Sequence, residues 1–111
     1  MMATYRPQKR DGRCYELAWN FLLCDERYKD GWCLVHGQTL GPGDQIPHAW
    51  LLNDRGQMVY DPVRDEHFAI AEYERRFRSA EWEKYAPREA AFTMAKHRHY
   101  GPWMEFPEEL S

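Results

Sequence analysis

Two short apolar segments separated by a polar turn constrain the fold of this chain more than any other feature. The first runs from His48 to Leu52, the second from Gln57 to Asp61, and Asn-Asp-Arg-Gly lies between them. Turn-forming residues between two strand-like segments predict a β-hairpin. If residues 53–56 form the turn, residue 52 lies opposite residue 57. His48 then lies opposite Asp61, with their Cβ atoms about 5 Å apart. The sequence therefore predicts that an imidazole and a carboxylate meet on one face of a sheet.

The remaining segments predict an α+β fold around this hairpin. β-Branched and aromatic residues predict a strand over residues 32–40, and residues 82–85 are interpreted as a further short strand. Apolar residues at helical spacing predict a helix from Cys14 to about Cys24, with Asp11 as its N-cap. Two C-terminal helices follow, the first around residues 70–77 and the second over residues 87–97. We expect the N-terminal helix to pack on a small antiparallel sheet.

Length and charge limit the classes of protein to consider. The chain has 111 residues, enough for one domain and one core, and its polar first ten residues are interpreted as a flexible tail or extended lead-in. The net charge of −3, with 18 acids against 15 bases, argues against a nucleic-acid partner. Apolar runs are too short to span a membrane, and the N-terminus has no apolar signal core. We therefore expect a cytoplasmic protein without a membrane partner.

The cysteines support a reducing compartment. Cys14, Cys24 and Cys33 are odd in number and widely spaced, which disfavours a disulfide framework and a zinc knuckle. His97 and His99 form an H-x-H pair without a third ligand. No metal or other cofactor is expected.

Cys14 is the cysteine best placed for chemistry. A thiolate is stabilised in the first turn of a helix by unpaired backbone N–H groups and by the helix dipole. Cys24 is expected at the opposite end of the same helix, where the dipole disfavours an anion. A nucleophilic cysteine needs an imidazole as general base, and that imidazole needs an orienting carboxylate. Cys14, His48 and Asp61 are therefore the candidate catalytic residues.

These residues also carry a resemblance to known families. Gly12 to Leu17 (GRCYEL), followed by an apolar helix, resembles the nucleophile segment of arylamine N-acetyltransferases and, more loosely, of transglutaminase-like proteins. The segment from His48 to Leu52 (HAWLL), followed by Val59 to Pro62 (VYDP), resembles their His and Asp strands in the same order. The full run, with His99 to Trp103 (HYGPW), is similar to small papain-like proteins of phage and bacterial genomes.

The resemblance implies a papain/transglutaminase-like fold and a role for each residue. Cys14 corresponds to the nucleophile, His48 to the general base and acid, and Asp61 to the orienting carboxylate. Gln8 stands six residues before Cys14, the spacing of an oxyanion-hole glutamine in papain-like enzymes. Tyr15 and Trp50 are expected near the cleft, where they either line it or pack in the core. The chain has Asp11-Gly12 where the acetyltransferases have two glycines, and it lacks their cofactor-binding domain.

The expected function is that of a cysteine-dependent hydrolase or acyltransferase acting on an amide, isopeptide or thioester bond. Its partner would be a protein or peptide substrate, or a small acyl donor, and the sequence does not reveal the oligomeric state. One alternative is a protein-binding module that keeps the fold without catalysis. Another is a phage or bacterial protein that blocks a host factor through the charged helix of residues 69–78.

Overall fold

The computed structural model describes residues 3–10 and 12–103. Within those residues the chain forms three α-helices, one 3-10 helix and five β-strands. In chain order these are α1 (Cys14–Cys24), η1 (Glu26–Tyr28), β1 (Cys33–Leu40), β2 (Gln45–Asn53), β3 (Met58–Asp61), β4 (Glu66–Ala69), α2 (Ile70–Phe77), β5 (Ala80–Tyr85) and α3 (Pro87–His97). The fold class is therefore α+β, as the sequence predicted.

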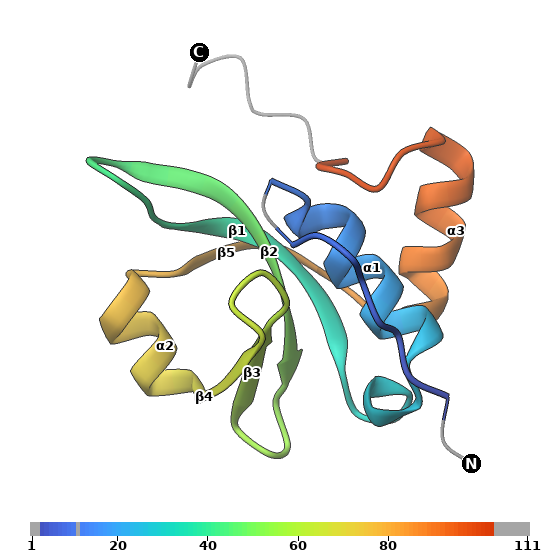
Figure 1. Cartoon of the computed structure of the whole chain (residues 1–111), viewed down its shortest axis with the longest axis horizontal. Helices are drawn as coiled ribbons and strands as arrows, with labels where there is room; N and C mark the ends of the chain where they lie inside the picture. Colours follow the sequence, from blue (N-terminus) through green and yellow to red (C-terminus); the bar gives the residue numbers. More distant parts are fainter. Residues whose placement is uncertain (1–2, 11, 104–111) are drawn as a thin grey trace.

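The five strands form one antiparallel sheet in the order β4-β3-β2-β1-β5. Helices cover both of its faces: α1 and α3 lie on one side and α2 on the other (Figure 1). The N-terminal helix packs on the sheet as expected, whereas the two C-terminal helices lie on opposite faces.

Alternation along the strands explains why two helical layers form. Successive strand side chains point to opposite faces of a sheet. Ala49 and Leu51 of β2 join the apolar cluster that contains α1 residues, whereas Trp50 and Leu52 join the cluster that contains Tyr73 of α2. Because β2 is the middle strand and is apolar on both faces, the sheet needs a cover on each side.

The helix boundaries follow local sequence signals. The predicted ends of α1 and α3 agree with the structure, and Pro87 is the first residue of α3. The Glu89 carboxylate accepts a hydrogen bond from the Ala86 backbone N–H and caps this helix end. The proposed N-cap of α1, Asp11, lies outside the described residues, and Arg13 directly precedes the helix.

β2 begins at Gln45, three residues before the predicted start at His48, and β4 and β5 differ from the prediction as well. β4 was not predicted, because its four residues include the charged Glu66 and the polar His67, and only Phe68 is buried. β5 begins at Ala80, two residues before the expected start, and it carries the charged residues Glu81, Glu83 and Lys84. β4 forms by pairing with β3, and β5 forms by pairing with β1. The periodicity of the sequence does not indicate this pairing.

None of the helices in residues 3–10 and 12–103 is both long and apolar enough to cross a membrane.

Candidate active site

Cys14 is the first residue of α1 and is half-buried. The first backbone bond of this helix is donated by the Leu17 N–H to the Arg13 carbonyl at 2.8 Å. The preceding N–H groups of the first turn have no partner further back in the helix, as in any α-helix. Their partial positive charge is directed toward the helix N-terminus, where Cys14 lies.

The hairpin prediction is correct, but its register is not. The turn occupies residues 54–57 rather than 53–56, so Asn53 pairs with Met58 and Leu52 with Val59. The displacement follows from Gln57, which adopts a left-handed backbone with φ of 53° and stays in the turn. The Asn53 side chain also accepts a hydrogen bond from the Gly56 N–H at 2.9 Å. If the ladder is extended by one pair beyond Leu51 and Tyr60, Asp61 lies opposite Trp50. The predicted partner of Asp61 was His48, two residues earlier in β2.

His48 and Asp61 nevertheless meet. A register difference of two residues keeps every side chain on its predicted face, and diagonal neighbours remain within reach of long side chains. The His48 Nε2 atom lies 3.0 Å from the Asp61 Oδ2 atom, and both side chains are buried. The predicted contact is therefore present across a diagonal of the sheet.

The environment of His48 favours its charged form. Burial by itself lowers the pKa of an imidazolium, but hydrogen bonds and charge interactions with Asp61 and Cys14 outweigh burial. Together they raise the pKa of His48 to about 9. The charge state of His48 is thus influenced both by the Asp61 carboxylate and by the Cys14 thiol at the start of α1.

Asp61 has further partners, which neither the motif nor the register indicated. Its Oδ2 atom also accepts hydrogen bonds from the Tyr73 hydroxyl and from an Arg64 guanidinium nitrogen, each at 2.7 Å. Its Oδ1 atom accepts bonds from the backbone N–H groups of Val63 and Arg64. Burial raises the pKa of a carboxylic acid, but these donors and His48 hold the pKa of Asp61 well below its usual range. The carboxylate is therefore ionised at neutral pH.

The two added side chains come from different elements. Arg64 follows Asp61 by three residues, and its guanidinium lies 4.0 Å from the centre of the Phe77 ring. The sequence signal that could have indicated Arg64 was its position three residues after Asp61, within an Asp-Pro turn. Tyr73 is fully buried on α2, and burial beside Asp61 raises its pKa well above the ordinary value. Only tertiary packing brings Tyr73 to the carboxylate.

Cys14 and His48 line one hollow of about 610 Å³ between the start of α1, the β1–β2 hairpin and the loop after β3. Its lining residues are Gly12, Cys14, Tyr15, Thr39, Ile46, Pro47, His48, Val63 and Arg64. We call this hollow the Cys14 cleft. The candidate nucleophile and base therefore line the same cleft, although the His48 side chain is itself buried.

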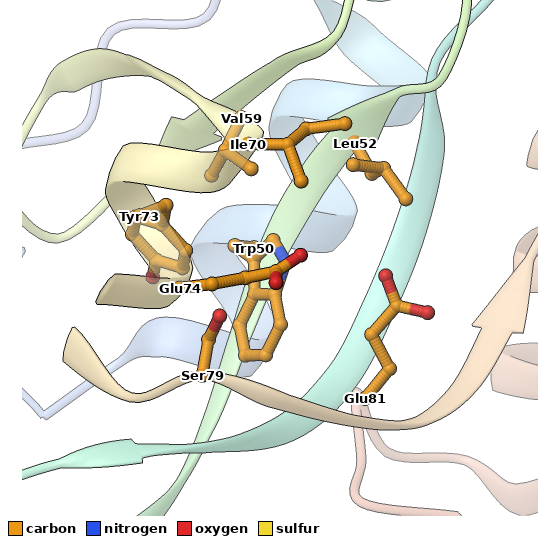
Figure 2. Close-up of a pocket in the computed structure, with 8 residues that line it drawn as sticks. All are labelled: Trp50, Leu52, Val59, Ile70, Tyr73, Glu74, Ser79 and Glu81. Atoms are coloured by element: carbon orange, nitrogen blue, oxygen red, sulfur yellow. The ribbon is translucent and has the colours of Figure 1, made fainter. Parts of the chain in front are cut away.

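The other predicted site residues lie at different places. Tyr15 lines the Cys14 cleft. Trp50 instead lines a separate hollow of about 270 Å³ on the α2 side of the sheet, together with Tyr73, Glu74 and Glu81 (Figure 2). Gln8 is exposed and borders another hollow with Lys9 and Arg10. Tyr15 therefore lines the Cys14 cleft, whereas Trp50 and Gln8 line other hollows, that of Gln8 sharing Val63 with the cleft.

The remaining histidines and cysteines have other surroundings. His36 is fully buried against the rings of Tyr15 and Trp103, and burial lowers its pKa to about 4. Its ring nitrogens have no hydrogen-bond partner within the described part of the chain. Cys24 is exposed, and burial raises the pKa of Cys33 to about 11. Among residues 3–10 and 12–103, no group of three or more His, Cys, Asp or Glu side chains is arranged to hold a metal ion.

Comparisons of the chain with protein-family models, with curated proteins and with solved structures gave no match.

Proposed function

We propose that this protein is a cysteine-dependent hydrolase or acyltransferase in which Cys14, His48 and Asp61 act as a catalytic triad. The observation that carries the proposal is His48, a buried imidazole that bonds the Asp61 carboxylate and interacts with Cys14 in one cleft. The substrate bond is an amide, isopeptide or thioester. Hydrolysis of a peptide or isopeptide is our first choice, because water, unlike an acyl-accepting amine, needs no second binding site.

The first half-reaction forms an acyl-enzyme. The Cys14 thiolate attacks the carbonyl carbon of the substrate, and the carbonyl π electrons move to oxygen. When the tetrahedral intermediate collapses, the bond from carbon to the leaving group breaks. The His48 imidazolium gives its proton to the departing amine or thiolate. The raised pKa of His48 supports this role, because the proton is in place at neutral pH.

The developing oxyanion needs hydrogen-bond donors near the nucleophile. The backbone N–H groups in the first turn of α1 are suited to this task, because they point toward the helix N-terminus, where Cys14 lies. Gln8 is not included in this proposal because it is exposed and borders a different hollow.

The second half-reaction releases the acyl group. Neutral His48 takes a proton from water, or from an amine in a transfer reaction, as that nucleophile attacks the thioester carbon. The carbon–sulfur bond then breaks, Cys14 leaves as the thiolate, and His48 is again protonated. The Asp61 carboxylate keeps the imidazole oriented throughout and stabilises its charged form.

We further propose that the fold is of the papain/transglutaminase kind. The order of a cysteine helix, a histidine strand and an aspartate strand supports this, as does the antiparallel sheet packed on α1. The three free cysteines fit a protein that works in a reducing compartment such as the cytoplasm.

The first test is the rate of Cys14 alkylation by iodoacetamide between pH 5 and pH 9, measured at each cysteine by peptide mass spectrometry. An ordinary thiol has a pKa of about 8.5 and reacts slowly at pH 6. We expect Cys14 to react at least about tenfold faster than the exposed Cys24 at pH 6. In His48→Ala, that difference should disappear.

The matched control is His97→Ala, which replaces an exposed histidine at the far end of α3. It should leave the Cys14 rate unchanged. If Cys14 and Cys24 react alike in the wild type, the catalytic proposal is wrong, and a binding module on this fold becomes the better description.

A further inference from the structure

We propose that the Cys14 cleft selects an uncharged, apolar acyl group, bound between Ile46 of the hairpin and Val63 of the loop after β3. This inference rests on the proposed function, since it names the class of acyl group that the same site takes. It goes beyond that function because the triad alone does not discriminate among acyl groups.

Ile46 provides the first part of the apolar surface. It lines the Cys14 cleft and leaves 43 % of its surface exposed. Its side chain lies against Gly41 across the hairpin, where an added Cβ would come within 2.9 Å of it. A β-branched side chain has few χ1 rotamers, so this contact restricts the conformation of the Ile46 side chain at the edge of the cleft. A bound apolar group would cover the surface that now faces solvent.

Val63 provides the second part, and its position is tied to the triad. Its backbone N–H donates to the Asp61 Oδ1 atom at 3.0 Å. The same carboxylate binds His48 through its other oxygen. These bonds to Asp61 therefore fix the position of Val63 relative to the His48 imidazole. Pro47 extends the apolar surface on the hairpin side of the cleft.

The charges around the cleft argue against a charged acyl group. None of its described lining residues has a carboxylate, and the lining residues that carry positive charge are His48 and Arg64. The guanidinium of Arg64 already bonds Asp61 at 2.7 Å and packs over Phe77. A cationic acyl group finds no counter-charge in these residues, and an anionic one would have to compete with Asp61. A neutral acyl group needs no counter-charge and does not compete with Asp61 for Arg64.

The size of the cleft suits such a group. Its volume of about 610 Å³ lies within the usual range of about 300–1,000 Å³ for small-molecule sites. It therefore has room for an aliphatic or aromatic side chain together with the reacting carbonyl.

The test uses three alkylating probes on the full chain: iodoacetamide, N-hexyl iodoacetamide and iodoacetate. In each reaction the cysteine sulfur forms a bond to the methylene carbon, the carbon–iodine bond breaks and iodide leaves. The rate for each probe is measured at Cys14 and, in the same molecules, at the exposed Cys24. Dividing the Cys14 rate by the Cys24 rate removes the intrinsic reactivity of each probe.

We expect the normalised rate of N-hexyl iodoacetamide to exceed that of iodoacetamide by at least about tenfold at Cys14, and to saturate with probe concentration. Iodoacetate should show no such gain. Ile46→Ser should reduce the hexyl preference several-fold. Leu40→Ser is the matched control, because Leu40 is 41 % exposed on the same hairpin and does not line the cleft. Thermal unfolding of both variants checks that each is folded.

Equal hexyl preference at the two cysteines, or a preference for iodoacetate at Cys14, would overturn the inference. An equal loss of preference in Ile46→Ser and Leu40→Ser would also overturn it, since Ile46 would then have no special role. Failure of the proposed function looks different: Cys14 would react with plain iodoacetamide no faster than Cys24 at pH 6. A hexyl preference in that case would still support an apolar cleft.

Discussion

Asp61 combines two roles that sequence reasoning treats as alternatives. An aspartate before a proline commonly caps its own turn, and the Oδ1 atom does so by accepting bonds from the N–H groups of Val63 and Arg64. The Oδ2 atom accepts bonds from His48, Tyr73 and Arg64. Since the turn holds the carboxylate rigidly, the same bonds that shape the loop also orient the imidazole.

Tyr73 is expected to position His48 through Asp61. Tyr73→Phe removes one hydroxyl donor from a buried carboxylate and keeps the ring. We expect the free energy of unfolding to fall by about 1–3 kcal/mol. Without this donor the carboxylate is less firmly held, so Cys14 alkylation at pH 6 should slow. Urea unfolding and the alkylation rate measure the two effects.

The control for Tyr73→Phe is Tyr60→Phe. Tyr60 is equally buried, but its hydroxyl donates to Asp65 rather than to Asp61. Its loss should reduce stability without changing the pH dependence of Cys14 alkylation. If both variants slow alkylation equally, Tyr73 has only a structural role.

His36 predicts how stability depends on pH below neutrality. Its folded pKa is about 4 because burial disfavours the charged ring, whereas an unfolded histidine has a pKa of about 6.5. As the pH falls below about 6.5, the unfolded chain binds a proton that the folded chain does not. The free energy of unfolding should therefore fall by about 1.4 kcal/mol per pH unit until the pH approaches 4.

His48 acts in a different pH range and with the opposite sign. Its folded pKa of about 9 lies above the unfolded value, so its contribution is complete below about pH 6.5 and is lost as the pH rises through 9. Urea unfolding at pH 6, 5.5 and 5, below the range in which the His48 contribution is lost, therefore isolates His36 from His48. We expect His36→Leu to flatten the dependence, while His97→Leu should not. Parallel curves for His36→Leu and wild type would contradict this expectation.

At the scale of elements, the close contact of β1 with β5 depends on one glycine. The pairing of these strands shifts between His36 and Gly37. A Cβ on Gly37 would lie 2.2 Å from the Ala80 carbonyl oxygen and 2.8 Å from the Trp50 ring. Any other residue there would force the strands apart or displace the indole.

Gly37→Ala should therefore lower the free energy of unfolding by about 2–3 kcal/mol and reduce hydrogen-exchange protection in β5. Gly43→Ala in the β1–β2 turn is the comparison, because its Cβ would meet no atom within 4 Å. There the cost arises from φ of +85° alone, and we expect about 1–2 kcal/mol. Equal losses with unchanged protection in β5 would show that the close contact is not important.

At the scale of the whole molecule, the N-terminal segment contacts the loop that follows the candidate aspartate. Tyr5 donates its backbone N–H to Asp25, and the Ala3 carbonyl accepts a bond from Glu26. Further along, the Arg10 guanidinium donates to the Pro62 carbonyl and lies 3.6 Å from Asp65. These contacts connect residues 3–10 to η1 and to the end of β3.

We expect Arg10→Ala to reduce the free energy of unfolding by about 1–2 kcal/mol, because it leaves the Pro62 carbonyl without this donor. Cys14 alkylation at pH 6 should slow as well, since the loop carrying Asp61 loses a support. The control is Arg6→Ala, an exposed residue whose side chain bonds Thr4 at 3.5 Å, with an expected change within about 0.5 kcal/mol. Unchanged alkylation in Arg10→Ala would remove the N-terminal segment from the site.

The sequence by itself determined the features that rest on local periodicity and turn chemistry. The ends of α1 and α3 and the presence of the hairpin follow from residues a few positions apart. The shared face of His48 and Asp61 also follows, because strand side chains alternate with a period of two and a register error of two residues preserves the face.

Tertiary structure alone decided the features that depend on residues distant in the chain. The strand β4 depended on its pairing with β3, and β5 on its pairing with β1. Tyr73 reaches Asp61 from a helix on the same face, and Ile46 and Val63 share one cleft with Cys14. Packing forms these contacts, and their energies depend on burial and distance, which no local pattern encodes.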